Sequence, residues 1–233
     1  MDLQSTEEWQ IANEENNKSL ITYWENRYKT GGNSGNGSYN QEAVMKATII
    51  NHWIKEYDIK TINEIGCGDA NNLLMYTVPI AYSGYDISPK AIEICNQKTR
   101  KIRNSLMYYF TSEYNKQDFD ANLLLCLDVW FHQVLDEDFE KLCKNIFTDF
   151  RGKYVIIYST DSNSQFTQDG LPLSPHCRNR EVLSEIQKYP QWRVLYWLSG
   201  IEVNHDGKVT NEQFPGLKRF YLLERIPLDV NKV

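Results

Sequence analysis

The stretch TINEIGCGDA, residues 61–70, joins a short β-branched run to a pair of glycines. The run predicts a buried strand over residues 61–65. Gly66 and Gly68 then predict a sharp turn, because a residue without a Cβ adopts positive φ readily and lets a ligand approach the backbone. Asp69 is a candidate N-cap for a helix expected to follow directly. Strand, glycine turn and helix in this order are typical of the nucleotide-binding crevice of an open α/β sheet.

A second acidic position supports this interpretation. The segment AYSGYDIS, residues 81–88, contains the next predicted strand, and Asp86 lies twenty residues after Gly66. Folds of this kind place an acid at that distance, where its carboxylate accepts hydrogen bonds from ribose hydroxyls. Pro89 suits the first turn of a helix predicted over residues 90–100. The sequence therefore predicts a site for a nucleotide-type cosubstrate.

Three segments of the chain resemble the class I S-adenosylmethionine-dependent methyltransferases. They are EIGCGDA (64–70), YDIS (85–88) and LLLCLDVWFH (123–132). The resemblance implies a Rossmann-like α/β fold with a seven-stranded, mostly parallel sheet of order 3-2-1-4-5-7-6, helices on both faces and an N-terminal helical cover. It also implies methyl transfer from S-adenosyl-L-methionine, with S-adenosyl-L-homocysteine as the product.

The family also implies roles for single residues. Its first glycine turn lies against the amino-acid part and ribose of the cosubstrate, the acid after the second strand binds the ribose, and the next hydrophobic residue packs on adenine. A polar residue after the third strand, here predicted over residues 106–110, usually lies near the adenine amine. The matching cosubstrate-binding positions are Glu64, Gly66, Cys67, Gly68, Asp86, Ile87, Ser112 and Asp128.

The segment YKTGGNSGNGSYN, residues 28–40, is rich in glycine, serine and asparagine, which predicts a loop. It is either a flexible linker or a loop whose backbone N–H groups wrap the cosubstrate. Its pattern from Gly31 to Tyr39 is similar to the segment before the first strand in a group of bacterial methyltransferases. Many of that group accompany sugar and surface-polysaccharide enzymes. In that group the loop closes over the cosubstrate, which adds the contact residues Tyr28, Gly32, Ser38 and Tyr39.

The run ANLLLCLD, residues 121–128, is apolar almost throughout, as expected of a central parallel strand buried on both faces. In the family the end of this strand lies beside the methyl donor, so the resemblance places Asp128 at the sulfonium or the acceptor. His132 follows, and its near-neutral pKa makes it a candidate general base for an acceptor hydroxyl. A structural histidine at a helix entry is the alternative. Asp128 and His132 are the predicted catalytic residues.

A long polar loop is predicted over residues 160–180, and its end carries His176, Arg178 and Arg180 before a predicted helix. Loops this long in a compact domain are usually functional or disordered. Three donors near a helix N-terminus can bind a phosphate or carboxylate, and a solvated basic turn fits the same pattern. The bacterial group shows a similar PHxRxR segment here. Together with His132, these three residues are the predicted acceptor-binding residues.

One domain without internal repeats is expected over residues 1–233. Residues 1–58 are expected to form the helical cover and the glycine-rich loop, and residues 59–233 the α/β core. Further elements follow from the hydrophobic periodicity. They are helices over parts of residues 1–30 and over 41–57, 136–150 and 182–189, and strands over 153–159, 192–198 and 218–226.

Composition limits the partners of the chain. A hydrophobic fraction of 41% and a charged fraction of 24% are ordinary for a globular protein. The net charge of −6 disfavours a nucleic-acid backbone as the main partner. No apolar run approaches the ~20 residues needed to cross a bilayer, and the acidic, polar first residues do not read as a secretory signal. The five cysteines lack metal-ligand spacing. We therefore expect reduced thiols, a cytoplasmic location and no metal.

The expected function is O-methylation of a small polar or anionic acceptor, such as a sugar or phosphoryl-type group of a surface-polysaccharide or capsule precursor. N-, C- or carboxyl methylation in secondary metabolism remains open. An NAD-dependent oxidoreductase is an alternative of a different class. Against it, Asn71 occupies the third position of the glycine motif, where glycine or alanine normally allows close helix–strand packing. A non-catalytic cosubstrate-binding partner is the remaining alternative.

Overall fold

The computed structural model describes residues 20–100, 108–113, 120–166, 171–199, 202–203, 209–210 and 218–227. Predictions for residues 1–19, for the start of the third strand at 106–107 and for residues 167–170 of the long polar loop lie outside the described residues. Within the described ranges, no helix is both long enough and apolar enough to span a bilayer.

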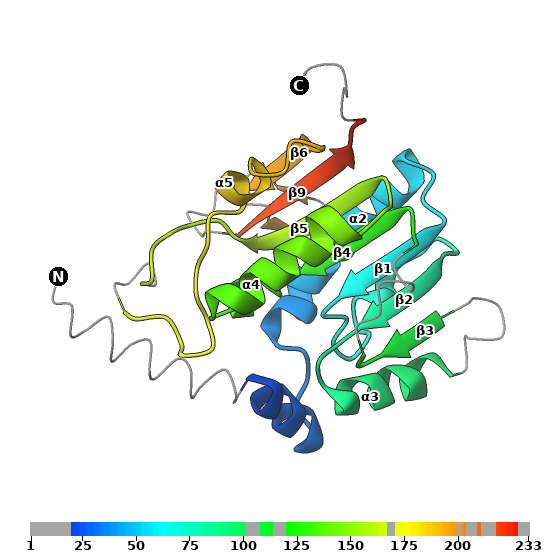
Figure 1. Cartoon of the computed structure of the whole chain (residues 1–233). Coiled ribbons are helices and arrows are strands. Elements are labelled where there is room, and N and C mark those ends of the chain that lie inside the picture. The colour runs from blue at the N-terminus through cyan, green and yellow to red at the C-terminus, as the bar shows by residue number, and fades with distance from the viewer. Residues whose placement is uncertain are drawn as a thin grey trace, which may run out of the picture.

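A seven-stranded sheet forms the centre of the fold, with the order β3-β2-β1-β4-β5-β9-β6 (Figure 1). β9 is antiparallel to β5 and β6, and the other pairings are parallel. Because β9 is the last sheet strand along the chain, this is the predicted order 3-2-1-4-5-7-6, which is confirmed. The strands are β1 (Thr61–Ile65), β2 (Ala81–Tyr85), β3 (Tyr108–Thr111), β4 (Leu123–Leu127), β5 (Tyr154–Thr160), β6 (Trp192–Ser199) and β9 (Lys218–Arg225). A separate pair is formed by β7 (Glu202–Val203) and β8 (Val209–Thr210).

Helices cover both faces of the sheet (Figure 1). On one face, α2 (Asn40–Glu56) and α3 (Pro89–Thr99) contribute to one hydrophobic cluster. On the other face, α4 (Asp136–Cys143), the π-helical stretch η5 (Lys144–Asp149) and α5 (Val182–Ile186) contribute to a second cluster. The helix predicted over 136–150 is therefore confirmed in extent but changes type, and the helix predicted over 182–189 ends earlier.

β4 shows why a continuous apolar run was needed at this position. All five of its residues are buried. Leu123, Leu125 and Leu127 belong to the first cluster, and Leu124 and Cys126 belong to the second. Since successive side chains of a strand point to opposite faces, a strand covered by helices on both sides must be apolar at every position.

The prediction that Asp69 caps a helix after the glycine turn is wrong. Only a short 3₁₀ turn, η2 (Leu73–Met75), follows, and Asp69 does not cap it. Ala70 has φ +64°, a left-handed conformation that interrupts a right-handed helix before it can start. Ala70 and Leu73 instead pack in the cluster to which α2 contributes, so α2 helps to cover this part of the sheet.

The buried face of α2 departs in two places from a purely apolar stripe. Ala47, Ile50, Trp53 and Ile54 are buried, whereas the apolar Val44 is 37% exposed. Lys46 is fully buried, although lysine rarely is unless paired. A charge at this position requires a partner inside the fold, and the functional site supplies it.

Trp130 follows β4 in the 3₁₀ turn η4 (Trp130–His132) and is completely buried against Phe139 and Phe147. Among the described residues, its indole N–H has no hydrogen-bond partner. We expect Trp130→Ala to lower the free energy of unfolding by about 3–5 kcal/mol. Trp130→Phe should cost clearly less, because it keeps most of the packing and loses no hydrogen bond. Urea denaturation of both variants measures this, and equal losses would contradict the packing account.

Candidate functional site

A cavity of about 630 Å³ lies at the carboxyl ends of β1, β2 and β4. Residues 20–29, which are helical, and the glycine-rich loop cover it. This is the edge at which open α/β sheets bind their ligands. The predicted site residues that line it are Tyr28, Ser38, Gly66, Gly68, Asp86, Ile87, Asp128, His132 and His176.

The glycine turn after β1 requires glycine at both positions. Gly66 has φ +74° and Gly68 has φ +57°, conformations that side chains make costly. A Cβ on Gly66 would overlap the side chain of Val129, and a Cβ on Gly68 would overlap Ser34. The turn is fastened to the next strand, because the Gly66 amide donates to the Tyr85 carbonyl at 2.7 Å. The result is bare backbone on the cavity wall.

Asp86 lies directly beside this turn. Its carboxylate accepts one hydrogen bond from the Gly68 amide and one from the Ser88 amide, each at 2.9 Å. Burial raises the pKa of Asp86 to about 6, so the group is mostly ionised at neutral pH. A carboxylate oxygen can accept more than one hydrogen bond, and the cavity-facing carboxylate can therefore still accept from ligand hydroxyls.

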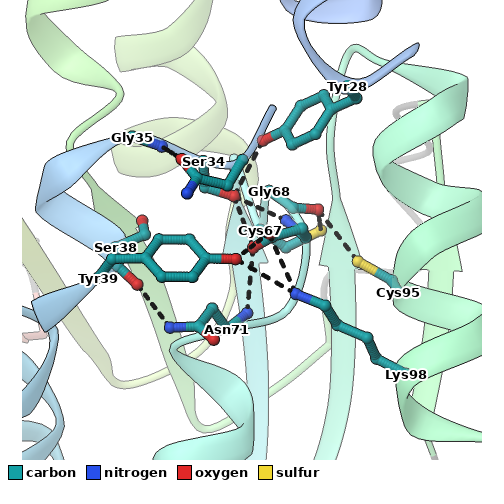
Figure 2. A network of polar contacts seen from close by, with 12 residues as sticks. Tyr28, Ser34, Gly35, Ser38, Tyr39, Cys67, Gly68, Asn71, Cys95 and Lys98 are labelled. Atoms are coloured by element: carbon teal, nitrogen blue, oxygen red, sulfur yellow. Dashed lines mark hydrogen bonds and ion pairs between the residues drawn. The ribbon is translucent and has the colours of Figure 1, made fainter. Parts of the chain in front are cut away.

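Asp69 fastens the glycine-rich loop to the turn after β1. In Figure 2, Ser34 and Tyr39 of the loop lie beside the turn at Gly68, and Lys98 reaches toward them from α3. Its carboxylate accepts from Ser34 Oγ at 2.7 Å and from Tyr39 Oη at 2.5 Å, and it pairs with Lys98 Nζ at 3.1 Å. Although burial raises the pKa of Asp69, the bonds from Tyr39 and Ser34 and the Lys98 charge outweigh it and lower that pKa. The Asn71 side chain adds a bond to the Ser38 carbonyl at 2.7 Å. Asn71 thus holds the loop.

The helical residues 20–29 are fastened on the other side of the cavity. Glu25 Oε2 accepts from Ser88 Oγ at 2.5 Å and from the Lys90 amide at 3.0 Å, at the start of α3. Tyr28 Oη lies 3.0 Å from Ser34 Oγ. The cover is therefore tied both to the helix after Asp86 and to the glycine-rich loop.

Asp128, at the end of β4, lies in a cluster of charged groups of which Lys46 is fully buried. It has φ +59° and pairs with Lys46 Nζ at 2.6 Å and Lys218 Nζ at 2.8 Å. Lys218 also pairs with Glu42 at 2.6 Å. Burial raises the pKa of Asp128, but the two ammonium groups outweigh it and lower the pKa to about 2. Asp128 therefore stays ionised and is not a proton acceptor at neutral pH.

His132 and His176 form a wall of the cavity beyond Asp128. Their rings are nearly parallel with centroids 5.5 Å apart, and His132 Nδ1 lies 3.0 Å from the His176 carbonyl oxygen. His176 also stacks on Tyr23, and Trp24 meets His132 edge-on. Burial lowers the pKa of His132 to about 4 and lowers that of His176. Both imidazoles are therefore neutral at pH 7.

Seven predicted site residues do not line the cavity: Gly32, Tyr39, Glu64, Cys67, Ser112, Arg178 and Arg180. Tyr39 acts on the loop through Asp69, and Glu64 is buried with its Oε2 2.6 Å from the Tyr82 hydroxyl. Arg178 and Arg180 pair with Asp136 at 3.1 and 2.8 Å and also donate to backbone carbonyls before α4. Both arginines are therefore held at the start of α4 and do not reach the cavity.

Sequence reasoning missed several residues of the site. Lys46 and Lys218 hold Asp128, Ser34 anchors the loop and Cys177 lines the cavity. For Lys46 a signal was present, because it interrupts the apolar side of a predicted helix. Lys218 and Cys177 come from distant segments, and no local pattern indicates what they contact.

Neither a protein-family model nor a curated protein matches this chain in sequence. Solved structures do match its fold. Magnesium protoporphyrin IX methyltransferase (ChlM) from Synechocystis PCC 6803, with bound SAH, has a TM-score of 0.58 and 14% identity, with 94% of this chain and 99% of that chain covered. An S-adenosylmethionine-dependent methyltransferase from Clostridium acetobutylicum has a TM-score of 0.56 and 13% identity, covering 81% and 93%. The methyltransferase domain of bacterial CtHen1 has a TM-score of 0.55 and 16% identity, covering 77% and 97%.

Identities this low show a shared fold and nothing more specific. The chain has the class I methyltransferase fold, with the sheet order that the sequence predicted.

Removing the loop anchor should loosen the cavity cover. We expect Asp69→Ala to lower the free energy of unfolding by about 1–3 kcal/mol, because three side-chain partners lose a buried acceptor. Limited proteolysis should then cut the glycine-rich loop faster. Glu93→Ala, which removes an exposed carboxylate paired with Lys90 on α3, is the control and should change stability by less than about 0.5 kcal/mol. Unchanged proteolysis in Asp69→Ala would contradict the anchoring role.

Glu64 should give the protein a pH-dependent stability. Burial raises its pKa from 4.5 to about 7, so the folded state binds more protons than the unfolded state between these values. The contribution of Glu64 to the free energy of unfolding is therefore complete below pH 4.5 and is lost as the pH rises through 7. Each pKa unit corresponds to about 1.4 kcal/mol. Urea denaturation across pH 4.5–8 measures the free energy of unfolding as a function of pH. Glu64→Gln should remove the part of its decrease with pH that comes from Glu64. If the free energies of the two proteins change in parallel with pH, Glu64 does not titrate in this range.

Proposed function

We propose that this protein is an S-adenosyl-L-methionine-dependent methyltransferase. One observation carries the proposal: the bare turn at Gly66 and Gly68 and the ionised carboxylate of Asp86 face the same cavity. A bare backbone suits close contact with a ligand, and a carboxylate beside it suits the hydroxyls of a ribose. The class I methyltransferase fold of the chain supports the same assignment.

The cosubstrate would occupy the part of the cavity between the glycine turn and the loop. In this proposal Asp86 accepts from the ribose hydroxyls, Ile87 packs on adenine, and Tyr28 and Ser38 contact the amino-acid part. Tyr39 and Glu64 act indirectly, through the loop anchor and through the support of β1. Ser112 lies outside the cavity wall, so it is not part of the proposed site.

The methyl acceptor would lie against His132 and His176. We propose a small polar acceptor that is methylated on oxygen, with a sugar of a surface-polysaccharide precursor as the first candidate. Arg178 and Arg180 are held at the start of α4, so recognition of an anionic group would depend on Lys218 at the cavity wall. The acidic net charge of the chain disfavours a nucleic acid as the acceptor and leaves a small molecule as the preferred one.

Methyl transfer from a sulfonium is an in-line displacement, and the donor is already activated. Positioning and exclusion of water can therefore supply much of the rate. His132 is in its proton-accepting form at pH 7, but an imidazole with a pKa of about 4 is a weak base for a hydroxyl. Asp128 stays ionised between two ammonium groups, and we propose that it orients the acceptor side of the cavity.

Asp86→Ala should weaken binding of S-adenosyl-L-homocysteine by about 1–3 kcal/mol, which is roughly 5–150-fold in Kd, because a charged hydrogen-bond acceptor is lost. Isothermal titration calorimetry measures the affinity, with NADH as the competing ligand. Glu224→Ala, which removes a carboxylate paired with Arg193 far from the cavity, is the control and should bind normally.

Two results would contradict the proposal. If the unmodified protein binds NADH in preference to S-adenosyl-L-homocysteine, the oxidoreductase alternative holds. If Asp86→Ala binds as tightly as the unmodified protein, Asp86 does not hold the ribose. Binding with no methyl transfer to any acceptor would favour a non-catalytic cosubstrate-binding partner.

A further inference from the structure

Three side chains of the kinds that bind transition metals converge on the acceptor side of the cavity. One ligand-type atom from each of His132, His176 and Cys177 lies within 4.8 Å of the other two. All three residues line the cavity. His132 and His176 are 44 residues apart in the chain, which explains why cysteine and histidine spacing in the sequence indicated no metal site.

Backbone contacts hold the two segments against each other. The Arg178 amide donates to the Phe131 carbonyl at 2.7 Å, and the Arg178 guanidinium donates to the Val134 carbonyl at 2.9 Å. The Cys177 amide donates to the Ser174 carbonyl at 2.8 Å, which closes a turn that presents the two donors. The basic segment that was expected to bind an anion thus positions a histidine and a cysteine at the cavity wall.

The spacing of the donors is close to what a tetrahedral ion needs. His132 Nδ1 and Cys177 Sγ are 3.8 Å apart. With Zn–N of about 2.0 Å and Zn–S of about 2.3 Å, a tetrahedral ion holds such a pair about 3.5 Å apart. His132 Nδ1 now contacts the His176 carbonyl oxygen, and an ion bound at this nitrogen would replace that contact. Small side-chain movements are therefore sufficient to form the site.

We propose that His132, His176 and Cys177 form a zinc site with three protein ligands and a fourth position that opens to the cavity. Two imidazoles and a thiolate are a donor set that Zn²⁺ accepts. Catalytic zinc sites keep one position open for water or substrate, whereas structural sites are closed by four protein ligands. The position of this cluster on the cavity wall fits the catalytic kind.

The role of the ion rests on the proposed function. An acceptor hydroxyl would bind at the fourth position and lose its proton to water, because Zn²⁺ stabilises the resulting anion. The bound oxygen would then attack the methyl carbon of the donor. The bond from carbon to the sulfonium sulfur would break with both electrons going to that sulfur, and S-adenosyl-L-homocysteine with a neutral sulfur would leave. The substrate class is thus a hydroxyl that a metal activates.

Cobalt titration of the full chain tests the metal site directly. Protein freed of metal by chelator and dialysis is titrated with Co²⁺ alone, and the thiolate-to-cobalt charge-transfer absorption is recorded. We expect one Co²⁺ per chain, a tetrahedral spectrum and displacement by Zn²⁺. Cys177→Ser should lose the thiolate band. His176→Ala should bind Co²⁺ at least tenfold more weakly, because changing a residue that only hydrogen-bonds to a metal ligand already lowers metal affinity ~10–100-fold.

A control variant distinguishes loss of the metal site from a general effect of removing a histidine. His52 is exposed on α2 and does not line the cavity, so His52→Ala should bind Co²⁺ like the unmodified protein. The four other cysteines remain in Cys177→Ser, and circular dichroism checks that the variants fold. If Cys177→Ser is unfolded, the His176→Ala and His52→Ala pair decides. No thiolate band in the unmodified protein, or an unchanged band in Cys177→Ser, would overturn the site.

Failure of the metal site and failure of the proposed function give different results. Co²⁺ binding is measured without cosubstrate, and calorimetry with S-adenosyl-L-homocysteine is done on metal-free protein. Cosubstrate binding without Co²⁺ binding overturns only the zinc site. Co²⁺ binding without cosubstrate binding overturns the methyltransferase assignment and leaves the metal site standing.

Discussion

The hydrogen bond from the Gly68 amide to the Asp86 carboxylate joins the turn after β1 to the end of β2. It requires a left-handed residue at Gly68, a strand that ends one residue before Asp86 and a parallel register between the two strands. These requirements place bare backbone and an ionised acid side by side at the carboxyl edge of the sheet. The cosubstrate-binding roles proposed for the cavity depend on this arrangement, because it sets the side on which a ribose would bind.

The rest of the cavity is built by two buried acids that bind distant segments. Asp69 gathers the glycine-rich loop and α3, and Asp128 gathers α2 and β9 through Lys46 and Lys218. Breaking a buried ion pair by removing one partner is strongly destabilising, whereas the intact pair contributes little net stability. We therefore infer that the main role of these two acids is to fix the positions of the segments that form the cavity. In the proposed function, this shape gives a covered donor side and an acceptor wall made of aromatic rings and imidazoles.

The sequence predicted the glycine turn and the place of Asp86, because each rests on a local pattern. The sheet order followed from the resemblance to the class I methyltransferases that these patterns carry. Apolar runs mark buried strands, and glycine marks left-handed backbone. The sequence did not predict that only a 3₁₀ turn follows the glycine turn, because this depends on the left-handed conformation of Ala70. It also did not predict Asp128 as the partner of Lys46, because the two residues are 82 positions apart. The sequence pattern predicted that Arg178 and Arg180 bind the acceptor. It could not indicate that they pair with Asp136, because this residue approaches them only through the tertiary fold.

A crystal structure of the protein with S-adenosyl-L-homocysteine would show whether the cavity binds the cosubstrate as proposed. We predict ribose hydroxyls within hydrogen-bond distance of the Asp86 carboxylate, adenine against Ile87, and the sulfur directed toward Asp128 and His132. Density for the ligand at another site, or a ribose that makes no contact with Asp86, would contradict the assignment of the cavity.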